Sequence, residues 1–236
     1  SIPKLISFFG SDEDQTLIPW IGGCDAGGYS AEHYMSVCRS EKYGGYEHWA
    51  FMGPWETEIS NHLRSASVVF FGNSRAQIAF STKAIREYFQ KRKIKFYSMG
   101  FAYNEYSRFA EIVAKKFQIK PRLVVVVADP FFLDKMASQG SYVLKGTWET
   151  RLKGWLKTYQ QRLHAYVCND LLNGWQDGFF CGSIDSMYRS RIDGTWKRDH
   201  YVILDKQSVS VANKIVPEAK IKQAEGVFRR FLSVIE

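Results

Sequence analysis

The stretch SVVFFGNSR (residues 67–75) decides the fold, because it joins an apolar run to a sharp polar turn. The apolar run is short and ends at Gly72, which is typical of a strand buried on both faces. Two similar runs follow, KFYSM at residues 95–99 and LVVVV at residues 123–127. Each run predicts a strand, and the β-branched third run is typical of a central strand in a parallel sheet.

The segments between these runs have helical periodicity. Residues 80–92 carry apolar side chains at helical spacing, with Ser81 or Thr82 as the expected N-cap. Residues 104–118 do the same, with Asn104 as the expected cap. Strands that alternate with helices predict right-handed βαβ units. We therefore expect a three-layer α/β/α fold with a parallel sheet.

The whole sequence predicts a single α/β domain with an N-terminal extension and one insertion. Residues 1–66 are rich in Gly and aromatic residues and predict an irregular N-terminal extension packed on the core, with short helices near Ala31–Arg39 and Glu56–Arg64. Residues 67–236 are expected to form the α/β domain, with an insertion at about 140–205. Three further elements are expected there: one long helix or two shorter ones over 148–172, a β-hairpin or irregular insertion over 174–203, and an amphipathic helix over 217–235.

The composition and net charge limit the classes of partner that the protein is expected to bind. The chain has 236 residues, is 45% hydrophobic and carries a formal net charge of +8, so it can bury a core and favours anionic partners. The densest basic cluster is Lys91, Arg92, Lys93 and Lys95. Neither zinc-finger spacing nor an RNA-recognition aromatic signature is present, so we expect no nucleic acid. An anionic surface or acidic polysaccharide remains open, beside the simpler interpretation of a solvated basic face. The abundant aromatic residues suggest a tightly packed core or a surface for sugars, lipids or proteins.

The number and spacing of the cysteines indicate the cellular compartment in which the protein is expected. Cys24, Cys38, Cys168 and Cys181 form no CxxC pair, so we expect no zinc site, metal or cofactor. Their spacing suggests two local disulfides, Cys24 with Cys38 and Cys168 with Cys181; four reduced thiols are the alternative. An even count favours an oxidising, extracytoplasmic location such as the periplasm or cell envelope. No apolar stretch of about 20 residues occurs, so an anchor is expected, if anywhere, in a segment outside this chain.

The turn after the first strand places Ser74 where a nucleophile would stand. Parallel strands bring their carboxyl ends to one edge, so residues 72–75, 99–101 and 128–130 should converge there. A serine that follows a strand and enters a helix projects its hydroxyl at that edge. The alternative is that Ser74 caps the helix. Arg75 is a candidate to hold an anionic substrate or to pair with Asp129.

A family resemblance sharpens this prediction. VFFGNSR (residues 69–75) resembles the first block of the SGNH (GDSL-like) hydrolases, in which the serine is the nucleophile. The segment KFYSMGFAYNE (residues 95–105) resembles the second block of their envelope-associated branch. The resemblance covers roughly residues 67–134, under a third of the chain. It implies a flavodoxin-like sheet, Ser74 as nucleophile, and the N–H groups of Ser74 and Gly100 in an oxyanion hole.

The remaining blocks of that family are less complete. The third predicted strand ends in Ala128-Asp129-Pro130 without the family's Asn, for which Asn104 or Asn73 is a candidate substitute. No Asp-x-x-His block follows residue 205. His200, with Asp193 seven residues earlier, keeps the order Ser, Asp, His and is the candidate base; the alternative is a loop residue. For His33, His48 and His62 we expect packing or hydrogen-bonding roles, and for His164 a structural role or an exposed position on a helix.

These observations give two expectations for function. The first is a serine esterase or O-acyltransferase acting on envelope carbohydrate, with an acylated carbohydrate or another ester as substrate. The second is a catalytically inactive SGNH-like module that serves as a structural or interaction subunit of an envelope-associated complex. Asp129 and Asp134 form a further pair that could bind a metal or act as an acid, although turn capping is the simpler interpretation.

Overall fold

The computed structural model describes residues 30, 32–38, 46–53, 56–101, 105–127, 132–171, 186–197 and 218–235. Its strands are β1 (Tyr34–Cys38), β2 (Val68–Asn73), β3 (Phe96–Phe101), β4 (Leu123–Val126), β5 (Ser186–Ser190) and β6 (Trp196–Lys197). Its helices are α2 (Tyr46–Met52), α3 (Thr57–Ser65), α4 (Ser74–Ala79), α5 (Lys83–Lys91), α6 (Ser107–Phe117), α7 (Ser138–Lys145), α8 (Trp148–Ala165), the π-helix η2 (Tyr166–Leu171) and α9 (Glu218–Ile235).

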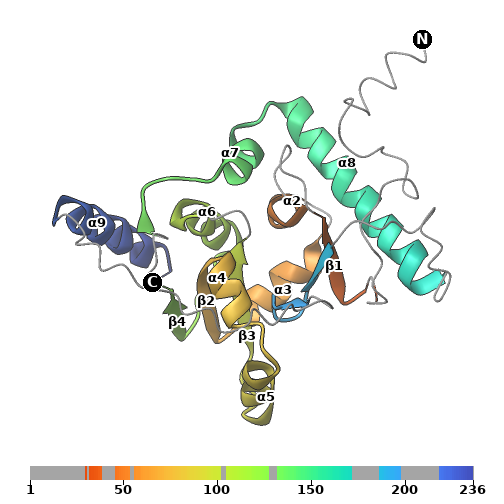
Figure 1. Cartoon of the computed structure of the whole chain (residues 1–236), viewed down its shortest axis with the longest axis horizontal. Coiled ribbons are helices and arrows are strands. Elements are labelled where there is room, and N and C mark those ends of the chain that lie inside the picture. The colour runs from red at the N-terminus through yellow and green to blue at the C-terminus, as the bar shows by residue number, and fades with distance from the viewer. Residues whose placement is uncertain are drawn as a thin grey trace, which may run out of the picture.

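The parallel sheet that the three apolar runs predict is confirmed. Its strand order is β3-β2-β4, and β2 pairs in parallel with both neighbours. The prediction that residues 123–127 form a central strand is wrong, because β4 lies at an edge of the described sheet and its residues are exposed or partly buried. Every residue of β2 is buried, as a central strand covered on both faces should be. The protein is therefore a mixed α/β protein built on a parallel sheet (Figure 1).

Alternate residues of β2 pack into two separate cores. Val69 and Phe71 join the larger core, to which α6 and α9 contribute. Val68 and Phe70 face the other way into a smaller core with Phe89 of α5. Because successive side chains of a strand point to opposite faces, an uninterrupted apolar run needs helices on both sides. The sequence pattern of β2 thus accounts for the placement of α5 and α6 in Figure 1.

A second, antiparallel sheet has the order β1-β5-β6. Here the helix predicted over Ala31–Arg39 is wrong, because Tyr34–Cys38 is a strand that pairs with Ser186–Ser190. The partner strand lies far along the chain, so local periodicity could not reveal the pairing. Strands β5 and β6 pair in the region predicted as a hairpin or irregular insertion.

Several other boundaries can be compared directly. The helices expected near 56–64, 80–92, 148–172 and 217–235 are present as α3, α5, α8 with η2, and α9. Helix α6 begins at Ser107 with Tyr106 as N-cap, so the prediction that Asn104 caps it is wrong. Helices α2 and α7 had no counterpart in the prediction, whereas α4 is the helix that Ser74 was expected to enter. Helix α2 lies within the region expected to be irregular, yet its Trp49 and Phe51 are buried in the larger core.

Helix α8 lies along the outside of the molecule beside α2 and β1 (Figure 1). Gly154 allows α8 to approach α2 closely, since a Cβ there would meet the Trp49 ring at 2.2 Å. Across the helices that the structure describes, none has both the length and the apolar character needed to cross a membrane.

Candidate functional site

The carboxyl edge of the parallel sheet begins where β2 meets α4. Asn73 pairs with Phe101 in the register of β2 and β3, so Ser74 follows at the same edge as the end of β3. From β2 the chain passes first to β3 on one side and then, through α6, to β4 on the other. The carboxyl end of such a central strand is where open α/β sheets bind ligands. Ser74 therefore stands at the position best suited to meet a ligand.

Asn73, and not Ser74, caps helix α4. Asn73 has an extended backbone, and its Oδ1 accepts a hydrogen bond from the Arg75 N–H at 2.9 Å. Ser74 is already the first residue of the helix. The hypothesis that Ser74 serves as the cap is therefore wrong, and its half-buried hydroxyl has no hydrogen-bond partner among the residues that the structure describes.

This assignment predicts different stabilities for two neighbouring substitutions. Asn73→Ala should lower the free energy of unfolding by about 1 kcal/mol, because it removes the cap. Ser74→Ala should change it by no more than about 0.5 kcal/mol, because no capping bond is lost. Urea unfolding followed by circular dichroism measures both values. The reverse order of destabilisation would show that Ser74 is the cap.

Gly100 lies in β3 against helix α4. Its N–H donates to Gln77 Oε1 at 3.1 Å, so the donor expected in an oxyanion hole is engaged within the protein. A Cβ at Gly100 would lie 2.6 Å from Gln77 Cβ and 2.8 Å from the Gln77 backbone nitrogen. The glycine thus allows close contact between strand and helix, and the oxyanion role predicted for it has no support in this arrangement.

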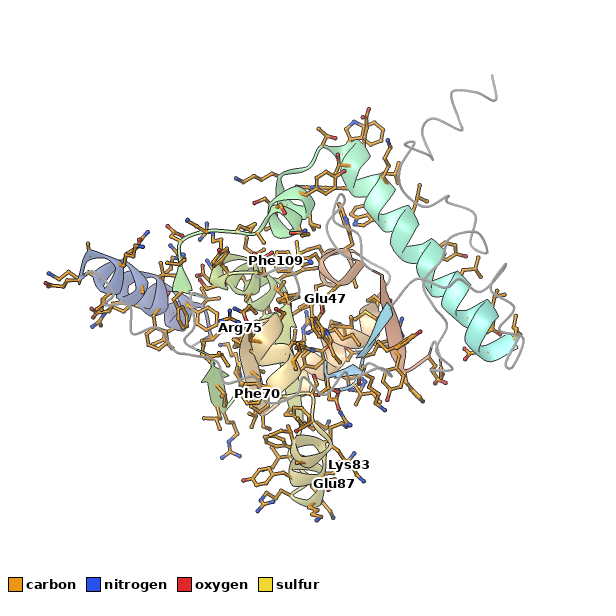
Figure 2. The ribbon with its side chains drawn as sticks, viewed as in Figure 1. Glu47, Phe70, Arg75, Lys83, Glu87 and Phe109 are labelled. Carbon is orange, nitrogen blue, oxygen red and sulfur yellow. The ribbon has the colours of Figure 1, made fainter. Side chains whose placement is uncertain are left out.

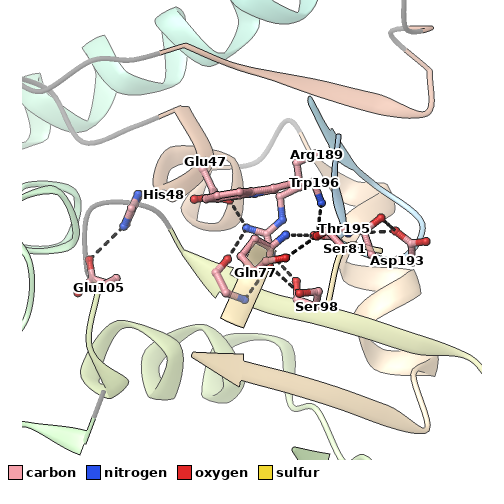
Figure 3. A network of polar contacts seen from close by, with 12 residues as sticks. Glu47, His48, Gln77, Ser81, Ser98, Glu105, Arg189, Asp193, Thr195 and Trp196 are labelled. Carbon is pink, nitrogen blue, oxygen red and sulfur yellow. Dashed lines mark hydrogen bonds and ion pairs between the residues drawn. The ribbon is translucent and has the colours of Figure 1, made fainter. Parts of the chain in front are cut away.

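Gln77 is the centre of a buried polar network (Figure 3). Besides the Gly100 N–H, its Oε1 accepts the Ser98 hydroxyl at 2.6 Å, and its Nε2 donates to the Gly194 carbonyl. Its own carbonyl accepts the Ser81 hydroxyl, which in turn accepts the Trp196 N–H at 2.7 Å. These bonds tie α4 to β3 and to the β5–β6 turn.

Arg189 extends this network from β5, and its side chain is completely buried. Its guanidinium forms an ion pair with Glu47 of α2 and donates to the carbonyls of Ser98 and of Gly100, the latter at 3.0 Å. It also lies over the Phe51 ring, 4.6 Å from the centroid. A buried guanidinium needs such partners to offset its lost hydration. Arg189 therefore joins the two sheets.

Asp193 has a structural role at the β5–β6 turn. Its Oδ1 accepts the Thr195 N–H at 3.0 Å and the Thr195 hydroxyl at 2.7 Å, while its carbonyl accepts the Ser98 N–H at 2.8 Å. Asp193 thus lies beside the middle of β3 rather than after its carboxyl end. Its predicted partner His200 lies outside the described residues, so their pairing stays a prediction.

The sequence did not predict that His48 and Glu105 form a buried pair. His48 Nε2 and Glu105 Oε2 are 3.0 Å apart, and both side chains are fully buried. The other oxygen, Glu105 Oε1, accepts the N–H groups of Tyr106 at 3.1 Å and Ala137 at 2.8 Å. The pair connects α2, the chain after β3 and the start of α7. This agrees with the hydrogen-bonding role expected for His48.

The remaining predicted residues fall into two groups. Arg75 is exposed at the start of α4 (Figure 2), and Asp134 accepts a hydrogen bond from Arg230 at 2.9 Å. That bond and the Arg230 charge lower the pKa of Asp134. For the second group the structure describes either no part of the residue or only its backbone. This group contains Asn104, Asp129, His164, His200 and the four cysteines. Within the described part of the chain, no group of three or more His, Cys, Asp or Glu could hold a metal ion.

No family model matches this sequence, nor does any curated protein or solved structure. The chemistry open to the site therefore follows from its own geometry. Among the residues that the structure describes at the carboxyl edge, Ser74 offers a half-buried hydroxyl without a hydrogen-bond partner. The described contacts place no histidine beside that hydroxyl.

Proposed function

We propose that this protein is an SGNH-like serine esterase or O-acyltransferase with Ser74 as the nucleophile. The observation that carries the proposal is the capping of α4 by Asn73, which leaves the Ser74 hydroxyl available at the end of the central strand. The strand order β3-β2-β4 supports it, because doubly wound flavodoxin-like sheets also place their first strand between the second and the third.

In the proposed reaction the Ser74 oxygen attacks the carbonyl carbon of an ester, and the alkoxide leaving group takes up a proton. An acyl-enzyme forms, and water or a carbohydrate hydroxyl then accepts the acyl group. A serine needs a general base for this step, and His200 is our candidate. With the Gly100 N–H engaged by Gln77, the Ser74 N–H and the Asn104 side chain are the candidate oxyanion donors.

We further propose an acylated envelope carbohydrate as the substrate and an extracytoplasmic location. The resemblance to the envelope-associated branch supports the substrate class. The even number of cysteines and the basic charge support the location and contact with an anionic surface.

The proposal is tested by covalent labelling. The full-length protein treated with a fluorophosphonate should carry the label on the peptide that contains Ser74, because the probe reacts with activated serines. Mass spectrometry identifies the labelled peptide, and the Ser74→Ala variant serves as the control. Equal labelling of Ser74→Ala, or none of the wild type, would rule out Ser74 as an activated nucleophile.

A second candidate function is favoured by the engagement of Gly100 and Asp193 in internal hydrogen bonds. In this alternative the protein is an inactive SGNH-like module that acts as a subunit of an envelope-associated complex. It predicts co-purification with a larger assembly and the same assembly in Ser74→Ala. Absence of labelling together with such an assembly would favour this alternative.

A further inference from the structure

An open pocket lies between α3, the α5–β3 turn and the β5–β6 turn. Its volume is about 350 Å³, within the range of small-ligand sites. Lys95 and Phe96, at the amino end of β3, line it, so it lies at the other end of that strand from the edge that follows Phe101. The pocket is therefore separate from the Ser74 site, and its ligand does not depend on the chemistry proposed there.

Among the charged residues that line the pocket, cations outnumber anions. Arg86, Lys93 and Lys95 contribute permanent positive charges, against the single carboxylate of Asp193. That carboxylate already accepts two hydrogen bonds from Thr195. Both lysines are exposed, and neither forms an ion pair with another residue in the described ranges. An anion entering the pocket would thus meet uncompensated positive charge.

The other lining groups suit a sugar ring. Phe89 and Phe96 form an apolar wall, and Ile94 and Ile192 stand exposed beside it. Ring C–H groups pack against such surfaces, while hydroxyls need hydrogen-bond partners of the kind that Ser65 and Gln90 offer. The combination of cations, an apolar wall and neutral polar groups fits a charged carbohydrate better than a bare ion.

The backbone of Lys93 is a third observation. Helix α5 ends in a Schellman motif, with the Ile94 N–H bonded to the Phe89 carbonyl and the Lys93 N–H to the Gln90 carbonyl. Lys93 occupies its left-handed position with φ 52°, where glycine is the usual residue. A lysine there is conformationally unfavourable. Such an outlier is a reason to look for a function of the side chain.

We propose that this pocket binds an acidic sugar unit, a pyranose-sized ring that carries a carboxylate or a phosphate. The oxyanion lies between Lys93, Lys95 and Arg86, and the ring packs on Phe96. The pocket size argues against an extended polymer groove and for recognition of one unit, whether free or within an acidic polysaccharide.

The test uses NMR titration of the full-length protein with glucuronate and glucose 6-phosphate, and with glucose and inorganic phosphate as controls. We expect saturable shifts around Ile94 with an acidic sugar and weaker binding of both controls. Lys93→Gly and Lys95→Gln should each raise the Kd roughly tenfold, the loss of about one charge-assisted hydrogen bond. Lys91→Gln, which removes a charge from the same basic cluster outside the pocket, should leave the Kd unchanged.

Lys93→Gly separates binding from folding, because glycine fits the left-handed position at least as well as lysine. Its Tm should stay equal or rise while the Kd rises. Binding of glucuronate alone or glucose 6-phosphate alone identifies the anion and supports the proposal. Equal binding of inorganic phosphate, preferential binding of duplex DNA, or the same Kd in Lys93→Gly and wild type would overturn it.

Discussion

Ser74→Ala should abolish the proposed esterase activity, with kcat/KM reduced by roughly 10⁴- to 10⁶-fold. The substitution removes the oxygen that would form the acyl-enzyme. Because Asn73 provides the cap of α4, the variant should fold like the wild type. Hydrolysis of p-nitrophenyl acetate and release of acetate from an acetylated oligosaccharide measure the loss.

Ser233→Ala is the matched control. Ser233 is an exposed serine of α9 whose hydroxyl donates to the Arg230 carbonyl at 2.7 Å. Its activity should equal that of the wild type. Activity retained by Ser74→Ala would mean that another group, or a contaminant, performs the hydrolysis.

Arg189→Ala should lower the free energy of unfolding by about 3–5 kcal/mol, the typical cost of breaking a buried ion pair. The loss leaves the Glu47 carboxylate buried without its cation and removes donors from the carbonyls of Ser98 and Gly100. It also opens a cavity beside Phe51. The Tm should fall by roughly 6–20 °C, as measured by calorimetry.

Arg229→Ala provides the comparison for this prediction. Arg229 pairs with Glu225 at 2.7 Å on the surface of α9, where both side chains are exposed. Exposed pairs contribute only about 0–1 kcal/mol, because water solvates both charges in the unpaired state. Equal destabilisation by Arg189→Ala and Arg229→Ala would contradict the stabilising role of the buried network.

The parallel sheet could be predicted because its information is local. The apolar run of β2 determines a strand that is buried on both faces, and the helical spacing of α5 predicts the helix that covers one of them. The β-branched run of β4 also determines a strand, but not its place in the sheet. In the same way the sequence pattern predicted Ser81 or Thr82 as the cap of α5, and Thr82 is the cap, with its Oγ1 accepting the Ile85 N–H at 3.3 Å. These features depend on residues a few positions apart.

The candidate site was predicted only in part. The position of Ser74 followed from the strand that precedes it, but its neighbour Asn73 was assigned no capping role. Both Asn and Ser are good caps, so composition could not decide between them. The backbone dihedrals decide it, because Asn73 is extended and Ser74 is already helical.

No local sequence pattern predicted the buried polar network of Glu47, Gln77 and Arg189. Each is a polar residue in an unremarkable local context, and charged residues are usually exposed. They are buried because α2, α4 and β5 meet at β3 and satisfy one another's hydrogen bonds. Such a network depends on contacts between residues far apart in the chain.

The sequence by itself therefore determined the parallel strands, their covering helices and the place of Ser74 at the end of β2, since a side-chain period and a turn are short-range properties. Only the tertiary structure decided that Tyr34–Cys38 is a strand, that Gln77 occupies the Gly100 N–H, and that Lys93 borders a cationic pocket. Each of these depends on a partner distant in sequence, whose position is set by the packing of the whole chain.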